Sequence, residues 1–236
     1  MSGVFLFGKM VNMPNKKIKI GILICAVLLI VFSVISWYVS EHKFVKVKDN
    51  HLDPKISGTY QNRLEDLNYS LTVAKTDDAK FDIEKQIGTE QYLLGLLNDS
   101  KQSYEAAINL KPNDYTGYVG LFRTQIDMKD LDGAKLSIAK ALSLNSSTVD
   151  VWIPDINFEE DVLHSSPVRI NDLYVQALSK TNSNIGLMTA YAYFEESQNK
   201  FETAKEYWQK ALQIDPKNKD YQAQFNRLSN LLKQQK

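Results

Sequence analysis

The sequence is poor in the residues that interrupt or cross-link a fold. Among 236 residues there are only 10 glycines, 6 prolines and 1 cysteine. A lone cysteine, Cys25, excludes an internal disulfide and a metal site built from several thiolates. The remaining composition is rich in Leu, Lys, Gln, Ala and Glu, which favours helices over strands. We therefore expect an all-α protein without a sheet.

An excess of charge is also missing. The 28 Lys and Arg residues balance the 28 Asp and Glu residues, so the formal net charge is zero. Without a basic field the chain has no long-range attraction for DNA or RNA. We expect no nucleic-acid partner.

One long apolar run is present near the N-terminus. Residues 20–39 contain no charged side chain, and as a helix they would span about 30 Å, the thickness of a bilayer's hydrocarbon core. Residues 16–19 include three lysines, and Trp37 and Tyr38 close the run, which is typical of the two membrane interfaces. We predict a single-pass transmembrane helix over 20–39, preceded by a cytoplasmic tail, 1–19.

Cleavage and orientation of this segment are separate questions. A signal peptide shares the basic start and the apolar core, and a cut after Ser36 or Ser40 would remove the anchor, although the run exceeds the roughly 7 to 15 residues of a signal-peptide core. Lysines before the run slightly outnumber those after it. The positive-inside rule then places the N-terminus inside, and the rest of the protein outside, a bacterial-type cell membrane.

A linker and a first helix follow the run. Residues 40–54 mix charges with single apolar residues and end in proline, which predicts a juxtamembrane linker. Apolar residues then recur at steps of three and four over 56–74, the pattern of one amphipathic helix. We assign 55–80 to an N-terminal helical extension and expect Asp77 or Asp78 to cap the next helix.

The sequence beyond this extension repeats itself. Four sets of residues, separated internally by steps of four, three and five, fit one frame: Ser100, Tyr104, Ala107, Pro112; Ala134, Ile138, Ala141, Ser146; Ile170, Tyr174, Ala177, Asn182; and Ala204, Trp208, Ala211, Pro216. The period is 34 residues, except that 36 separate the second copy from the third. We delimit the copies as 81–114, 115–148, 149–184 and 185–218, and expect a capping helix over 219–236.

Each copy is predicted to be a helix-turn-helix hairpin. Alanine lets two helices approach closely, and the large side chain beside it fills the adjoining groove. Such a hairpin cannot bury its apolar face alone, so the copies must stack into a solenoid. The turns between paired helices are expected at Asn98-Asp99, Asp132-Gly133, Ser165-Ser166-Pro167 and Asn199-Lys200.

The period and the spacing resemble the tetratricopeptide-repeat (TPR) family over roughly 81–218. The first helices match the family less fully than the second helices. The family's aromatic, leucine, glycine and aromatic positions fall on Glu84, Ile87, Gly88, Gln91; Tyr118, Leu121, Phe122, Gln125; Trp152, Asp155, Ile156, Glu159; and Met188, Tyr191, Ala192, Glu195. The third copy departs most, and we expect it to be bent or shortened.

The resemblance implies a binding surface. In this family the first helices line a concave groove that accepts an extended peptide or a helix of a protein partner. The residues expected to face that groove are Lys85, Thr89, Tyr92, Val119, Arg123, Thr189, Tyr193 and Glu196.

Patterns typical of catalysis or metal binding are not found in the sequence. Ser137 and Lys140 spell S-x-x-K without its companion motifs, which is a chance match. The acidic stretch 155–161 lacks the glycine and the final glutamate spacing of a calcium loop, so we predict a solvated acidic face. We expect no enzyme, and no catalytic residue, cofactor or metal.

Together these patterns predict an all-α protein in which one transmembrane helix carries a TPR-like α-solenoid. The expected function is a membrane-tethered scaffold or assembly factor that binds a peptide or partner protein. The alternative is a structural membrane protein that associates with itself as a homo-oligomer.

Overall fold

The computed structural model describes residues 54–234, which belong to one compact unit. The predicted tail and transmembrane helix, and the linker up to Asp53, lie outside the described residues. The helices are α3 (Pro54–Val73), α4 (Asp77–Leu93), α5 (Leu97–Leu110), α6 (Tyr115–Asp127), α7 (Leu131–Leu144), α8 (Val149–Asn157), a π-helical turn η1 (Phe158–Val162), α9 (Pro167–Lys180), α10 (Ile185–Ser197), α11 (Phe201–Ile214) and α12 (Lys219–Gln234). No strand occurs between residues 54 and 234, so the all-α prediction is confirmed for this part of the chain.

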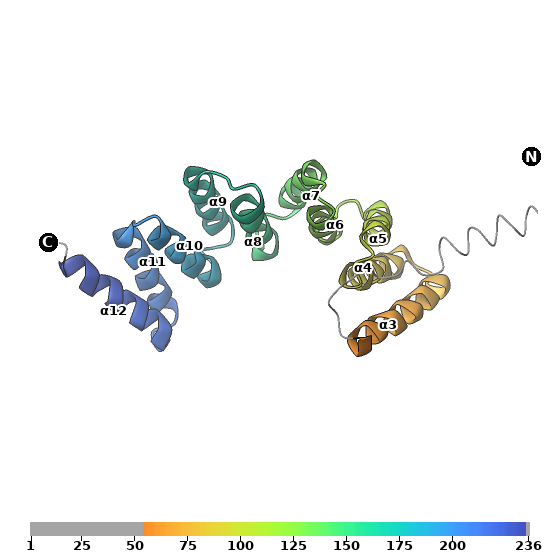
Figure 1. The fold of residues 1–236 in the computed structure, drawn as a ribbon, viewed down its shortest axis with the longest axis horizontal. Helices are drawn as coiled ribbons and strands as arrows, with labels where there is room; N and C mark the ends of the chain where they lie inside the picture. The colour runs from red at the N-terminus through yellow and green to blue at the C-terminus, as the bar shows by residue number, and fades with distance from the viewer. Residues whose placement is uncertain (1–53, 235–236) are drawn as a thin grey trace, which may run out of the picture. The chain divides into compact units, whose positions relative to one another are not determined.

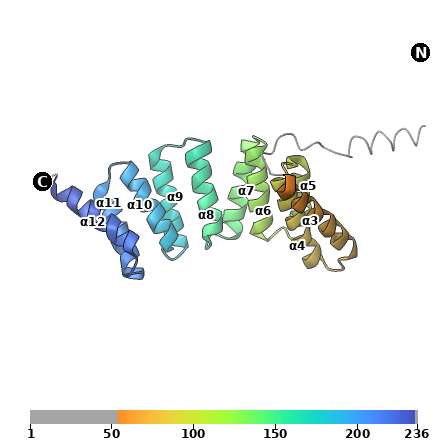
Figure 2. The same cartoon turned by 60° about the horizontal axis from the view of Figure 1, so that its bottom comes forward.

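The helices follow one another in sequence order (Figures 1 and 2). Four hairpins pair α4 with α5, α6 with α7, α8 with α9, and α10 with α11, while α3 packs on α4 and α12 packs on α11. From α6 onward, apolar side chains form three core clusters, and each cluster is shared between one hairpin and the helix that follows it. A core built from neighbouring repeats is the arrangement of an α-solenoid.

The repeated alanines lie in the centre of this packing. Ala107, Ala141, Ala177 and Ala211 are all 0% exposed. The large side chains three residues before them, which are Tyr104, Ile138, Tyr174 and Trp208, are also buried. The second helices therefore pack as their 34-residue spacing predicts.

The first helix of the third copy is irregular and its α-helical part is shortened, in the copy whose sequence departs most from the family. Helix α8 has 9 residues, whereas α4, α6 and α10 have 17, 13 and 13. Pro154 lies inside α8 and lacks the backbone N–H that an α-helix needs, and the chain continues as the π-helical turn η1. Trp152 and Ile156 nevertheless remain buried, so this copy keeps the frame of the others.

Three predicted caps or turns were wrong by a few residues. Thr76, rather than Asp77 or Asp78, caps α4. The predicted Asn98-Asp99 and Asp132-Gly133 turns lie inside the first turns of α5 and α7, and the chain reverses earlier, at Gly95 and Lys129, which have positive φ. Acidic residues favour the first turn of a helix because the positive end of the helix dipole stabilises their negative charge. Asp99 and Asp132 therefore lie just inside α5 and α7 instead of in the preceding turns.

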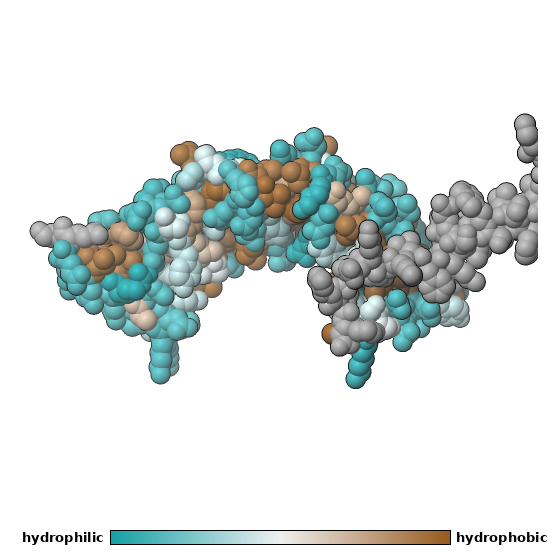
Figure 3. Space-filling model, in the orientation of Figure 1, coloured by the Kyte–Doolittle hydropathy of each residue, from teal (hydrophilic) through white to brown (hydrophobic). Residues whose placement is uncertain are grey.

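The surface is mostly polar. In Figure 3, hydrophilic side chains cover most of the visible face, and apolar surface gathers over α7 to α9 and where α12 meets α11. None of the helices within residues 54–234 combines the length and the hydropathy needed to cross a membrane, and the span predicted at 20–39 was not among the residues searched.

Candidate functional site

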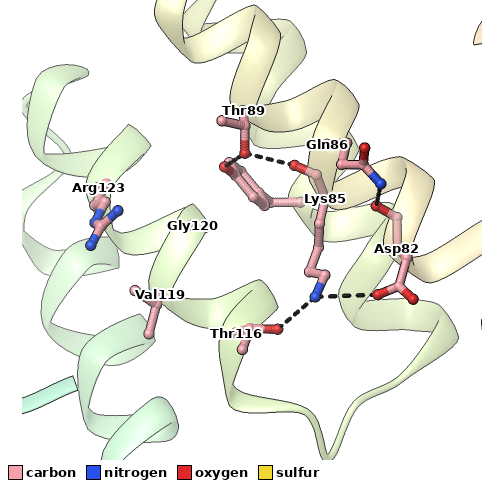
Figure 4. Close-up of a pocket in the computed structure, with 9 residues that line it drawn as sticks. Asp82, Lys85, Gln86, Thr89, Thr116, Val119, Gly120 and Arg123 are labelled. Carbon is pink, nitrogen blue, oxygen red and sulfur yellow. Dashed lines mark hydrogen bonds and ion pairs between the residues drawn. The ribbon is translucent and has the colours of Figure 1, made fainter. Parts of the chain in front are cut away.

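The eight predicted groove residues all lie on first helices and fall into two groups. Lys85, Thr89 and Tyr92 are on α4, Val119 and Arg123 are on α6, and Thr189, Tyr193 and Glu196 are on α10. Four of them line one pocket of about 440 Å³ between α4 and α6 (Figure 4). The complete lining is Asp82, Lys85, Gln86, Thr89, Tyr104, Thr116, Val119, Gly120 and Arg123.

Lys85 is held in place on one side of this pocket. Its Nζ donates a hydrogen bond to Thr116 at 3.0 Å and lies 3.4 Å from the Asp82 carboxylate. The same ammonium lies 4.3 Å from the centre of the Phe81 ring. Since Thr116 belongs to α6, Lys85 also ties the first two copies together (Figure 4).

Tyr104 and Gly120 form the floor of the pocket. The Tyr104 hydroxyl shares a 2.9 Å hydrogen bond with Thr89, and burial raises the pKa of the phenol, so Tyr104 stays neutral. A Cβ atom on Gly120 would lie 2.1 Å from the Tyr104 ring, too close for any real contact. Glycine at this position therefore allows the ring to lie close against α6.

Arg123 supplies a cation that has no ion-pair partner within residues 54–234. Its side chain is exposed, and it lines the pocket from α6, opposite Lys85 (Figure 4).

Tyr92 lies on α4, outside the pocket lining. Burial and the Asp127 carboxylate raise the pKa of Tyr92 to about 12, against the opposing effect of Arg123. The pocket lining thus contains the Arg123 guanidinium, the Lys85 ammonium, the hydroxyl groups of Thr89, Tyr104 and Thr116, and the apolar side chain of Val119.

The second group is mainly structural. The rings of Tyr193 and Trp208 pack edge to face, with their centres 4.9 Å apart. Glu196 accepts a 3.1 Å hydrogen bond from Trp208 Nε1 and pairs with Arg227, so it joins α10 to α11 and α12. Thr189 donates to Gly186 in its own helix. Of these residues only Tyr193, at 54% exposed, presents a large surface to solvent.

The prediction missed two positions between the groups. Ile153 and Asn157 lie on α8, 34 residues after Val119 and Arg123, and both are exposed. Ile153 is thus equivalent to Val119 and to Lys85 in the first copy, and Asn157 is equivalent to Arg123 and Thr89. The repeat period would have located them, but the third copy offered no clear first-helix match.

A second missed feature is a repeated polar contact between paired helices. Ser103 donates to Gln91 at 2.8 Å, and Ser137 donates to Gln125 at 2.7 Å. In the fourth copy the buried Glu195 instead pairs, at 3.2 Å, with Lys200, which precedes α11 in the turn between the two helices. Gln91, Gln125 and Glu195 all occupy the family's second aromatic position. These polar residues do not match the family pattern, and in the structure each makes a hydrogen bond or an ion pair. Ser137 therefore has a packing role, as expected of a chance S-x-x-K match.

The third copy makes different polar contacts at this first-helix position. Glu159 accepts a 2.5 Å hydrogen bond from Ser165 and pairs with Arg169 at 3.0 Å. Burial opposes ionisation of Glu159, but these donors prevail and lower its pKa.

The prediction of a solvated acidic face over 155–161 was wrong for Asp155. This residue is only 6% exposed, because it occupies the position of Ile87, Leu121 and Tyr191 beneath the second helix. Burial raises its pKa to about 6, with a further contribution from the nearby Glu159 and an opposing one from Arg169. Periodicity places the residue in the core whatever its charge.

Comparison with known proteins supports the repeat family. A family model of the tetratricopeptide repeat matches residues 185–218, the fourth copy. No curated protein sequence matches the chain.

Solved structures are similar in fold. A thermophilic TPR protein of Thermus thermophilus is 17% identical, with 72% of this chain and 91% of that chain covered and a TM-score of 0.50. Pseudomonas aeruginosa pilF is 16% identical, with 67% and 71% covered and a TM-score of 0.52. MamA is 16% identical, with 70% and 96% covered and a TM-score of 0.52. At these identities the likeness shows the fold alone, and it agrees with the predicted TPR-like solenoid.

Proposed function

We propose that this protein is a membrane-tethered scaffold that binds a segment of another polypeptide in the groove of its repeats. The observation that carries the proposal is the pocket between α4 and α6, where Lys85, Thr89, Val119 and Arg123 converge from two successive copies. Tetratricopeptide repeats stack into solenoids whose extended surfaces bind other proteins, and the match at 185–218 supports that role here.

The chemistry of the pocket suits a polypeptide. Main-chain carbonyl groups and acidic side chains accept hydrogen bonds, and the Arg123 guanidinium can donate them. The Thr89 hydroxyl already donates to the Lys85 carbonyl, and the Tyr104 hydroxyl then donates to Thr89, so these two groups can only accept further hydrogen bonds from a ligand. Lys85 already contacts Asp82 and Thr116, so Arg123 is the pocket cation with the most donors left for a ligand. Val119 adds an apolar contact for a neighbouring side chain.

A photo-reactive amino acid at position 119 tests this proposal directly. On irradiation of native membranes, the full chain should form a covalent adduct with another polypeptide, because Val119 lines the pocket. The matched control places the same amino acid at Lys101, which lies on α5 outside the pocket lining. An equal yield of the same adduct from both positions, or none from position 119, would contradict the proposal.

The membrane tether is a second part of the proposal, and it rests on the uncharged run at 20–39. Because lysines before the run outnumber those after it, a reporter enzyme fused after Lys236 should be active only on the extracytoplasmic side. Activity confined to the cytoplasm would reverse the orientation.

Catalysis is the less favoured function. The resemblance to TPR proteins points to interaction rather than to chemistry, and the pocket residues are those of a binding surface. Self-association is the closer rival, and the photo-crosslinking above separates the two, since a homo-adduct has twice the mass of the chain.

A further inference from the structure

The two ends of the described array carry complementary halves of a repeat. Tyr191, Ala192 and Glu195 on α10 are buried beneath α11, the second helix of their copy. The residues 34 positions later are Phe225, Asn226 and Ser229 on α12, and they line an open pocket of about 670 Å³ beside α11. Within residues 54–234 no second helix covers α12, which is therefore a first helix without its pair.

Ser229 indicates what this pocket lacks. Its hydroxyl oxygen is buried and has no hydrogen-bond partner among the described residues. The equivalent residues Gln91 and Gln125 each accept a hydrogen bond from a serine of the second helix. The unpaired hydroxyl thus lies where these copies join their two helices, and an unmet buried polar group favours a partner that can satisfy it.

Helix α3 is the converse, a second helix without a first helix among the described residues. Arg63 on α3 pairs with Glu90 on α4 at 2.9 Å. Thr124 is the residue 34 positions after Glu90, and it is bonded in turn by Ser100 on α5 at 3.0 Å. Arg63 therefore corresponds to Ser100, with an offset of 37 residues. The offset exceeds 34 because α4, with 17 residues, begins about one turn earlier in its copy than α6, with 13.

The free side of α3 carries apolar surface. Between Lys55 and Val73 no side chain is buried, and Tyr69 and Val73 are 70% and 55% exposed. With the 37-residue offset, the half-buried Leu67 corresponds to Tyr104, which is 7% exposed because it packs against its own first helix at Gly88 as well as against α6 at Gly120.

The charges and hydrogen-bonding groups of α3 complement those of the pocket on α11 and α12. With the 37-residue offset, the α3 residue that corresponds to Ser103 is Asp66, an exposed carboxylate beside the exposed Glu65. The pocket on α11 and α12 carries Lys205 and Lys233 against one acid, Glu202. A carboxylate at the position of Asp66 can accept from the Ser229 hydroxyl and lie near the two ammonium groups.

We propose that α3 of a second copy of this chain occupies the pocket between α11 and α12, completing a helical hairpin between the two molecules. The surfaces joined are different, so the contact is head-to-tail and can continue from copy to copy. Apolar residues Phe225 and Leu232 line the pocket and would be covered by the incoming helix. This inference does not rest on the groove between α4 and α6.

Disulfide crosslinking of two differently tagged full-length copies tests the inference. Both copies carry Cys25→Ser, which removes the natural cysteine. One copy carries Asp66→Cys and the other carries Ser229→Cys, and mild oxidation of co-expressed copies should yield a dimer bearing both tags. The matched control replaces Asp66→Cys by Asn68→Cys, an exposed residue two positions along α3 and so on another side of the helix.

The outcomes separate the proposal from its rivals. The expected result is a strong two-tag dimer with the cysteine at 66 and a weak one with the cysteine at 68, with the yield reduced by Lys233→Glu. Equal yields at 66 and 68, no two-tag dimer, or a dimer formed mainly between two Ser229→Cys chains would overturn it, and the last result would indicate a symmetric contact instead. Groove binding is unaffected by each of these outcomes, so failure here leaves the proposed function standing.

Discussion

Replacing Gly120 by alanine should destabilise the protein by about 2 to 3 kcal/mol, the upper part of the range for overpacking a core. The new Cβ would lie 2.1, 2.4 and 2.5 Å from three atoms of the Tyr104 ring. Tyr104 cannot withdraw freely, because it is 7% exposed and its hydroxyl is bonded to Thr89. Chemical denaturation of the purified protein, followed by circular dichroism, measures the loss.

Gly58→Ala is the matched control for this change. Gly58 also lies in a helix, α3, but a Cβ there meets no atom within 4 Å. Alanine should therefore stabilise α3 by roughly 0.5 to 1 kcal/mol, since glycine is the poorer helix former. If both substitutions had the same sign, the close approach of Tyr104 to α6 would not be the cause.

Asp155→Asn should stabilise the protein at pH 8 by about 2 to 3 kcal/mol, and much less at pH 4. The pKa of Asp155 is raised by burial from 3.8 to about 6, so the folded protein holds a proton that the unfolded chain has released between these values. Stability of the native sequence therefore falls as pH rises from about 4 to about 6, and the full cost persists above that range. Asparagine has nearly the same shape and no charge to desolvate.

The measurement is the free energy of unfolding of both proteins across pH 4 to 8. Subtracting the two curves separates Asp155 from Glu84 and Glu160, whose pKa values are also raised by burial. A difference that does not change with pH would show that Asp155 is solvated in the folded protein.

Periodicity was enough to predict the packing of the array. The 34-residue spacing identified four alanines that are 0% exposed, and the large side chains beside them. Spacing succeeds here because each copy repeats the same contact, so an error in one copy is corrected by the other three. The same spacing kept the third copy in frame despite Pro154 and the π-helical turn.

Residue type was a poorer guide than position. Asp155 was assigned to a solvated face because it is acidic, and Gln91 and Gln125 were counted as mismatches because they are polar. In the structure all three belong to the interface between paired helices, where Gln91 and Gln125 bond Ser103 and Ser137. A polar residue can occupy a core position when a neighbour meets its hydrogen bonds, and that neighbour is not visible from one residue.

The candidate groove was predicted in part for a similar reason. Residues from α4 and α6 converge on one pocket because the first two copies pack as regular neighbours. Glu196, by contrast, bonds Trp208 and pairs with Arg227 on α12. The position of an indole or a guanidinium from another helix depends on tertiary packing, so the sequence pattern of α10 alone could not reveal these contacts.

The central claim is that the pocket between α4 and α6 binds a polypeptide, and Arg123→Ala tests it most directly. The dissociation constant for the polypeptide crosslinked from position 119 should rise about tenfold or more, the effect of losing roughly 1.4 kcal/mol of binding energy. The unfolding midpoint should hardly change, because Arg123 is exposed. Lys101→Ala, on α5, should leave both quantities unchanged. Unchanged affinity in Arg123→Ala, or a loss of affinity that merely follows a loss of stability, would contradict the account.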